Sequence, residues 1–558
     1  MKQPKAQVSS NSARGAGLIG SAALIAVITA VSRVFGFGRT MVFSGNVGDT
    51  CVGTAYASAN VLPNVLFEVA AGGALAGAVV PLLAGPISRA AAGLDDTARD
   101  EVDRIASALI GWALLVLVPL SILLAVLSGP LSRRLVGDDC LGQQALAARM
   151  IIVFAPQIVL YGIGVVLSGV LTAHRRFLWP AAAPLLSSLV VITAYVAFGV
   201  TAHGAKLAIG LPRAAEAWLA WGTTAGVAVM TLPLLIPLRR SGLRLRPTLR
   251  FPPGVARRGR ALAGAGIGAL LAQQTAVVVA LLLANHTGDK GAFPVFQYAQ
   301  AVYLLPYAVL AVPLATSAFP RLAERATAGD RAGFAATASV STRAVVVAAL
   351  FGAAVLGGVA EPVGRFFAAN DAARNLGAAL PSLGPALTVM APGLLGFALI
   401  AHVARALYAL ELGRTAAAAT ATGWLVVIIG SVLATRWAEI VVGLAWGSTI
   451  GMMVAGGLLL IALRRSAGPE AVAGLARVLI AGSVAALIAA LAGRAVAGPM
   501  LTALGTGRAG SVLCAALAAL VSGLVFVVLL ALLDRKDLAT MLERLPINPL
   551  RPRPRAVR

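Results

Sequence analysis

The sequence predicts an all-α polytopic membrane protein, with about 14 transmembrane helices in two pseudo-symmetric six-helix lobes plus two C-terminal helices. Three observations predict this class. Hydrophobic residues make up 59% of the 558-residue chain and charged residues only 12%. Lysine and arginine concentrate in alternate connections between the apolar runs, and short motifs recur six runs apart in the two halves. No soluble domain has this composition.

The elements expected from hydropathy are fourteen apolar runs, each long enough to cross the bilayer as a helix. Alanine and glycine are frequent in them, which is typical of membrane helices that pack closely. The connections are too short to hold a separate soluble domain. The runs cover residues 17–43, 55–85, 105–131, 145–173, 179–201, 216–238, 261–285, 295–319, 335–360, 382–410, 415–435, 438–463, 471–497 and 510–534.

Basic residues mark one side of the membrane. With a cytoplasmic N-terminus, the inside segments hold roughly 29 Lys/Arg and the outside connections roughly 9, so the positive-inside rule predicts that both termini are cytoplasmic. The same bias accounts for the net charge of +24. It indicates contact with anionic membrane lipids and not with nucleic acid. The expected location is a bacterial plasma membrane.

The segment between the sixth and seventh runs divides the chain near its middle and holds eight arginines. Pro247, Pro252 and Pro253 exclude a long helix there. The predicted divisions are a cytoplasmic tail at 1–16, an N-terminal lobe at 17–238, a basic cytoplasmic linker at 239–260, a C-terminal lobe at 261–463, a helix pair at 464–534 and a basic cytoplasmic tail at 535–558.

Short similarities between the halves suggest that the two lobes are related. Leu62-Pro63-Asn64 in the second run matches Leu305-Pro306-Tyr307 in the eighth. The sequence at 170–173, before the fifth run, matches that at 406–409, before the eleventh. Both pairs of runs are six apart, as expected of two six-helix repeats. Internal repeats with proline-interrupted helices are typical of transporters.

Two arginines in the first run carry a charge into a membrane helix, which is energetically unfavourable. A charged side chain at the centre of a membrane helix costs about 2.5–3.5 kcal/mol, so Arg33 and Arg39 are candidates for a functional site. Their planar guanidiniums suit phosphate oxygens. Gly36 and Gly38 between them would allow a bend that turns both toward one cavity. The alternative, stronger for Arg39, is that the side chain extends to the lipid headgroups.

The remaining chemistry-bearing residues do not predict catalysis. Cys51 and Cys140 both fall in connections expected outside, where a disulfide between them is an open alternative to two free thiols. The four histidines lack the spacing of a metal site, and no phosphate-binding loop accompanies the glycines. We therefore expect no metal, no cofactor and no enzymatic activity.

Five motifs in order resemble the MurJ/MviN lipid II flippase family of the MOP exporter superfamily, in its actinobacterial-type branch. The similarity extends over roughly residues 17–534. The motifs are SRVFGFGR from Ser32 to Arg39, Leu62-Pro63-Asn64 with Gly72-Gly73, GVLTAHRRFLWPAAAP from Gly169 to Pro184, LPYAVLAVPLATSAFPRLAE from Leu305 to Glu324 and ARALYALELGRT from Ala404 to Thr415.

This resemblance implies two lobes around a central cavity that opens alternately to each side of the membrane. The helix pair at 464–534 would form a groove for a polyprenyl tail, and Arg33 and Arg39 would bind the pyrophosphate of lipid II. The expected substrate is thus lipid II or a related undecaprenyl-pyrophosphate lipid. The protein is expected to be a monomer, and proteins of cell-wall synthesis remain open as partners.

Other polar residues in the apolar runs are candidates to line the cavity. Each has a structural alternative, because interhelical hydrogen bonds of Asn and Gln are common in membranes and stabilise by about 0.6 kcal/mol on average. Glu68 could pair with Arg33 when no substrate is bound, either as a gate or as a purely structural ion pair. The candidates are Asn60, Asn64, Glu68, Gln273 and Gln300.

Several positions depart from the family pattern. Thr54 and Gln300 stand where many members carry acidic residues, and Phe67 and Glu68 stand where many carry basic ones. These departures keep two alternatives open: a MOP-type exporter of another polyprenyl-linked glycan or of a drug, and a non-transporting cell-wall scaffold. A scaffold would tolerate loss of Arg33, whereas a flippase would not.

Overall fold

The computed structural model describes residues 9–91, 97–137, 140–205, 207–240, 245–255, 267–372, 379–504 and 507–534, with the side chains of 9–26, 71–78, 91 and 504 excepted. Most of these residues are helical, and none of them lies in a strand. The chain divides into two compact units, unit 1 (Met1–Ile267) and unit 2 (Gly268–Arg558). The predicted tail at 535–558 lies outside the described residues.

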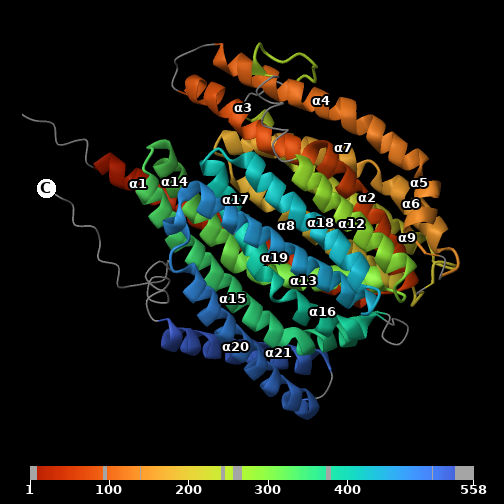
Figure 1. Ribbon diagram of the computed structural model, residues 1–558. Coiled ribbons are helices and arrows are strands. Elements are labelled where there is room, and N and C mark those ends of the chain that lie inside the picture. Colours follow the sequence, from red (N-terminus) through yellow and green to blue (C-terminus); the bar gives the residue numbers. More distant parts are fainter. Residues whose placement is uncertain are drawn as a thin grey trace, which may run out of the picture. The chain divides into compact units, whose positions relative to one another are not determined.

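Unit 1 follows the predicted order of apolar runs (Figure 1). α1 begins at Ser9, inside the range predicted as the N-terminal tail. Its elements are α1 (Ser9–Asn46), α2 (Cys51–Phe67), the π-helical turn η1 (Glu68–Gly72), α3 (Gly73–Ala91), α4 (Ala98–Val126), α5 (Ser128–Leu135), α6 (Gln143–Phe154), α7 (Gln157–Ala173), α8 (Leu178–Thr201), α9 (Arg213–Thr231), η2 (Leu232–Leu234) and α10 (Leu235–Arg239).

Unit 2 is built around α15. In the most apolar stretch of this helix 72% of the residues are buried inside the protein, whereas in that of α21 the share is 22%. α20 and α21 pack against α15 and against each other (Figure 1). The elements are α12 (Ile267–His286), α13 (Ala292–Pro306), the π-helical turn η3 (Tyr307–Ala311), α14 (Val312–Thr327), α15 (Arg331–Asn370), η4 (Leu380–Ser382), α16 (Leu383–Met390), α17 (Gly393–Ala409), α18 (Gly413–Ala434), α19 (Ile440–Ala467), η5 (Pro469–Val472), α20 (Leu475–Leu504) and α21 (Arg508–Leu533).

Each predicted run falls on a helix or on a succession of short helices. By length and composition, 11 helices of the described residues can cross a membrane, or up to 12 if the bent pair Leu380–Met390 and Gly393–Ala409 is one span. α1 and the α2–α3 pair, which coincide with the first two runs, are not among them. The polytopic all-α class is confirmed, and the exact number of fourteen stays a prediction.

The proline motifs that recur in the two halves coincide with the same backbone irregularity. η1 lies five residues after Pro63, and η3 directly follows Pro306. Proline cannot donate the backbone hydrogen bond of a regular helix, and π-helical turns accommodate such interruptions. In unit 2, Pro306 packs on Gly352, where an added Cβ would lie 2.9 Å from the Cβ of Pro306. The resemblance between the second and eighth runs therefore extends to their local structure.

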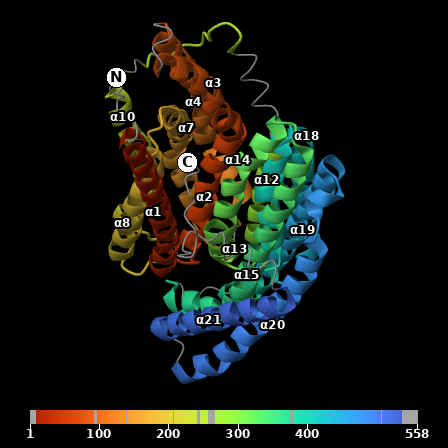
Figure 2. The same cartoon turned by 90° about the vertical axis from the view of Figure 1, so that its left-hand side faces the viewer.

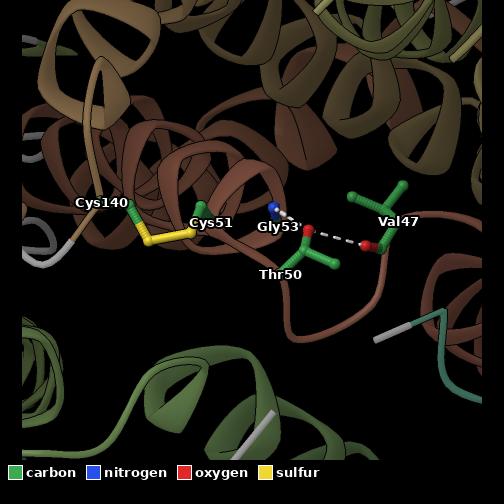
Figure 3. Close-up of a disulfide and its surroundings, with 5 residues drawn as sticks. All are labelled: Val47, Thr50, Cys51, Gly53 and Cys140. Atoms are coloured by element: carbon green, nitrogen blue, oxygen red, sulfur yellow. Dashed lines mark hydrogen bonds between the residues drawn. A yellow bond between two sulfur atoms is a disulfide. The ribbon is translucent and has the colours of Figure 1, made fainter. Parts of the chain in front are cut away.

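A disulfide joins Cys51, the first residue of α2, to Cys140, in the connection before α6 (Figure 3). Their Cα atoms are 6.0 Å apart, although the residues are 89 positions apart in the chain. The Thr50 hydroxyl accepts a hydrogen bond from the Gly53 N–H at 3.0 Å and so begins α2 at this point. The sequence by itself does not decide between this disulfide and two free thiols. Since disulfides persist in oxidising spaces, the pairing supports an outside location for both connections.

We expect the disulfide to form when the protein matures in its own host. After alkylation of free thiols, the full chain should migrate faster on a non-reducing gel than after reduction. Cys51→Ser and Cys140→Ser should each abolish the difference and lower the thermal midpoint, because a disulfide closing a long loop contributes about 2–4 kcal/mol. Cys514→Ser, which changes the buried free cysteine of α21, should keep the difference. Full alkylation of Cys51 in the native protein would contradict this pairing.

Candidate functional site

The two arginines predicted to bind phosphate both lie on α1, and both are exposed. α1 packs beside α8 within unit 1 (Figure 2). The helix continues without a break through Gly36 and Gly38, and a Cβ at either glycine would meet no atom within 4 Å. The glycines therefore leave open space on α1 between the arginines, and the expected bend does not take the form of a helix break.

Arg39 lies beside three tyrosines of unit 1. Its guanidinium is close enough to the hydroxyls of Tyr56, Tyr161 and Tyr195 for its charge to act on each of them. These tyrosines come from α2, α7 and α8, so the charge of Arg39 acts on three helices that are far apart in sequence. Arg39 itself is exposed, so both interpretations of this residue, phosphate binding and contact with the lipid headgroups, stay predictions.

The hydroxyls of Tyr56 and Tyr195 belong to a buried chain of hydrogen bonds. The two tyrosine oxygens are 2.8 Å apart, and Tyr56 Oη is 2.9 Å from Thr223 Oγ1. Thr223 donates to the carbonyl oxygen of Leu219 at 2.7 Å. Because each hydroxyl has one hydrogen, Tyr56 donates to Thr223, and Tyr195 donates to Tyr56. The rings of Phe43 and Phe154 pack against Tyr56 at centroid distances of 5.5 and 5.7 Å.

A second polar contact joins α7 to α9. Gln157, which is fully buried, donates to the Thr224 hydroxyl at 2.9 Å, and Thr224 donates to the carbonyl oxygen of Val153 at 2.9 Å. The Oε1 atom of Gln157 is buried and has no hydrogen-bond partner among the described residues. Both polar contacts hold helices of unit 1 together.

We expect Tyr56→Phe to destabilise unit 1 by about 1–3 kcal/mol, because the hydroxyls of Tyr195 and Thr223 would lose their buried partner. The measurement is the thermal midpoint of the purified protein in detergent. Tyr408→Phe is the matched control, since Tyr408 is 50% exposed on α17 and should leave the midpoint unchanged. Equal midpoints for wild type and Tyr56→Phe would contradict the hydrogen-bond chain.

The other candidates in unit 1 lie along α2 and η1. Asn64 donates through Nδ2 to the backbone oxygen of Asn60 at 2.9 Å. The Oδ1 atom of Asn60 is buried and has no partner among the described residues. Glu68 is the first residue of η1 and is partly exposed. Among the described ion pairs none joins Glu68 to Arg33. The gating pair therefore stays a hypothesis.

The two candidates of unit 2 lie on different helices. Gln273 is partly buried on α12, and Gln300 is exposed on α13. Two residues before Gln300, the buried Tyr298 donates to Asp371 at 3.2 Å, which is a structural contact at the end of α15. Within the described residues, no three His, Cys, Asp or Glu side chains gather closely enough to hold a metal ion.

Sequence reasoning missed the three hydroxyls of unit 1 that hydrogen-bond to one another. Tyr56, Tyr195 and Thr223 stand in apolar runs, and their positions are 139 and 167 residues apart. The one available signal was chemical: a phenol or hydroxyl buried in hydrocarbon needs a partner. That signal does not identify the partner.

The family model and the relatives found by sequence similarity point to the same family. The family model "Lipid II flippase MurJ" matches residues 43–513. A probable lipid II flippase MurJ of Rhizobium tropici is 26% identical over 431 residues, covering 76% of this chain and 78% of its own. The lipid II flippase MurJ of Burkholderia cenocepacia is 30% identical over 309 residues, covering 53% and 55%.

Solved structures show the same fold. A lipid II flippase MurJ in an inward closed conformation superposes with a TM-score of 0.70 at 20% identity, covering 92% of this chain and 99% of its own. An inward-facing multidrug resistance MATE family transporter of the MOP superfamily gives 0.63 at 13% identity, covering 79% and 96%. The helical fold, the ordered motifs and the family match over most of the chain lead to one conclusion: this protein belongs to the MurJ lipid II flippase family.

Proposed function

We propose that this protein moves lipid II from the inner to the outer leaflet of the plasma membrane by alternating access, with Arg33 and Arg39 binding the pyrophosphate. The observation that carries the proposal is the family match over residues 43–513. The resemblance in the sequence motifs extends further toward the N-terminus and includes both arginines. The relatives that match are described as lipid II flippases. We propose the same cargo for this chain.

The chemistry of the arginines supports this assignment. A pyrophosphate carries negative charge that hydrocarbon cannot solvate, so a carrier must supply fixed cations on the way. Neither Arg33 nor Arg39 forms an ion pair with a carboxylate of the described residues. Each guanidinium can therefore donate paired hydrogen bonds to phosphate oxygens. The tyrosine hydroxyls near Arg39 do not neutralise its charge.

The remaining candidates have supporting roles in this proposal. Asn60, Asn64, Gln273 and Gln300 would hydrogen-bond the sugar and peptide parts of the headgroup. The buried Oδ1 atom of Asn60, which lacks a partner among the described residues, is suited to accept such a bond. Glu68 would compete with the phosphate for the arginines and so favour release. The helix pair at 464–534 would hold the polyprenyl tail.

The setting of this transport follows from the charge distribution of the chain. The protein is a multi-pass membrane protein of a transporter family, and we infer that both termini are cytoplasmic, as the positive-inside rule predicts. The proposal requires no catalytic step, cofactor or nucleic acid, and a monomer suffices for it. Cell-wall synthesis proteins, which would use lipid II at the outer face, are natural partners for such a carrier.

Depletion of the protein in its own host tests the proposal. Lipid II on the outer leaflet would be quantified with an externally added, membrane-impermeant enzyme that cleaves it, while total lipid II is measured in parallel. The expected result is loss of accessible lipid II with accumulation of the total, and restoration by the wild-type gene. Unchanged accessible lipid II after depletion would overturn the proposal and favour another cargo or a scaffold.

A further inference from the structure

The linker after α10 includes a short extended segment, Leu245–Phe251, that is attached to α4; we call it the linker strap. The backbone N–H of Arg246 donates to the Ser107 hydroxyl at 3.0 Å, and that of Thr248 donates to the Ser107 carbonyl oxygen at 3.3 Å. The indole N–H of Trp112 donates to the carbonyl oxygen of Leu249 at 3.0 Å. These three bonds fix the path of the strap across one face of α4.

A glycine of α4 makes this close attachment possible. A Cβ added to Gly111 would contact the Thr248 carbonyl oxygen and lie 2.7 Å from its carbon and 2.9 Å from its nitrogen. These are backbone atoms, which cannot turn away as a flexible side chain would. The strap therefore lies directly on the backbone of α4, and only glycine permits this at position 111.

The strap has one face toward the protein and one face away from it. Leu245 and Phe251 pack on the apolar core of unit 1. Arg246, Leu249 and Arg250 are exposed, with Leu249 at 49%. An exposed leucine between two exposed arginines is an arrangement that suits a surface both anionic and apolar.

The contact with α4 shows the depth of the strap relative to the membrane. Residues of α4 before the contact include the exposed, charged Arg99 and Arg104. From Trp112 onward the exposed side chains of α4 are apolar, and include Leu115, Val116, Val118, Ile122, Leu123 and Val126. Tryptophan is enriched where hydrocarbon meets headgroups. The strap, which crosses α4 at Trp112, therefore lies at the level of the lipid headgroups on the side where α4 begins.

We propose that the linker strap is a binding site for an anionic phospholipid, with Arg246 and Arg250 holding the phosphate and Leu249 entering the acyl region. Neither guanidinium forms an ion pair with a carboxylate in the part of the chain that the structure describes. A guanidinium can hold a phosphate through paired hydrogen bonds. Backbone attachment to α4 orders the strap before the lipid arrives, which lowers the entropic cost of binding. The site does not depend on the transported cargo.

The test uses the full chain purified in neutral detergent and titrated with dioleoylphosphatidylglycerol or dioleoylphosphatidylcholine. Native mass spectrometry gives the apparent Kd of the bound lipid. We expect the wild type to prefer phosphatidylglycerol. The double variant Arg246→Gln/Arg250→Gln should lose roughly fivefold in affinity for each arginine, the factor that corresponds to about 1 kcal/mol per basic residue.

A matched variant separates a site from general charge attraction. Arg133→Gln/Arg134→Gln removes the same charge from two exposed arginines of α5, at the far end of α4, and should keep the wild-type Kd. Trp112→Phe keeps an aromatic ring but loses the bond to Leu249, and should weaken binding while both arginines remain. Wild-type affinity in the strap double variant, or equal losses in both double variants, would overturn the proposal.

Discussion

Replacing Arg39 by alanine is expected to abolish rescue in the depletion assay, while the variant protein remains folded in the membrane. The charge of the guanidinium acts on Tyr56, Tyr161 and Tyr195, so its removal takes away a cation that this part of unit 1 can offer to a phosphate. A hydrogen bond to a charged group contributes about 1.5–3 kcal/mol. Loss of a bidentate contact should therefore reduce transport by at least about tenfold.

Arg39→Lys distinguishes phosphate binding from simple membrane anchoring. Lysine reaches the headgroups as well as arginine does, so an anchoring residue would tolerate the change. It cannot reproduce the paired hydrogen bonds of a planar guanidinium, so a phosphate-binding residue would not. We expect Arg39→Lys to give partial rescue and Arg33→Ala to act in the same direction as Arg39→Ala.

The control for these variants is Arg133→Ala, an exposed arginine on α5, which should rescue fully. Membrane levels of every variant would be compared by immunoblot, so that loss of protein is not mistaken for loss of transport. Full rescue by Arg39→Ala at wild-type levels would remove Arg39 from the transport mechanism. It would leave the family assignment unchanged.

Replacing Gly447 by leucine is expected to prevent folding of unit 2. Gly447 lies where α19 meets α18, and an added Cβ would lie 2.8 Å from the Cα of Ser431 and still closer to its backbone nitrogen. Small residues let membrane helices approach to this distance, and a larger one forces the backbones apart. Gly423, Gly430 and Gly451 lie in the same contact and would be affected by the same separation.

The matched control for Gly447 lies further along α19. A Cβ at Gly457 would meet no atom within 4 Å, so Gly457→Leu should fold with the same gain in helix propensity. The measurement is fluorescence-detected size-exclusion chromatography of the solubilised protein. The wild type and Gly457→Leu should give a single symmetric peak, and Gly447→Leu should aggregate. A normal peak for Gly447→Leu would show that the α18–α19 contact adapts.

The sequence alone was sufficient to predict the class of fold and to identify the charged residues that are most unfavourable in a membrane helix. In hydrocarbon every backbone group must be satisfied within its own segment, so a spanning helix is a property of consecutive residues. The apolar runs consequently coincide with helices along both units. The free-energy cost of placing an arginine in such a run also depends on its position in the run. The order of residues is therefore enough to select Arg33 and Arg39.

Tertiary structure decided which residues far apart in the chain meet. The bonds from Tyr56 to Tyr195 and Thr223 join residues 139 and 167 positions apart, and the strap meets Ser107 across 139 positions. The chain's 60 glycines look alike in sequence. Gly111 and Gly447 differ from Gly457 only because another backbone lies against them. Such contacts depend on how helices cross, and the sequence of a single helix does not contain that geometry.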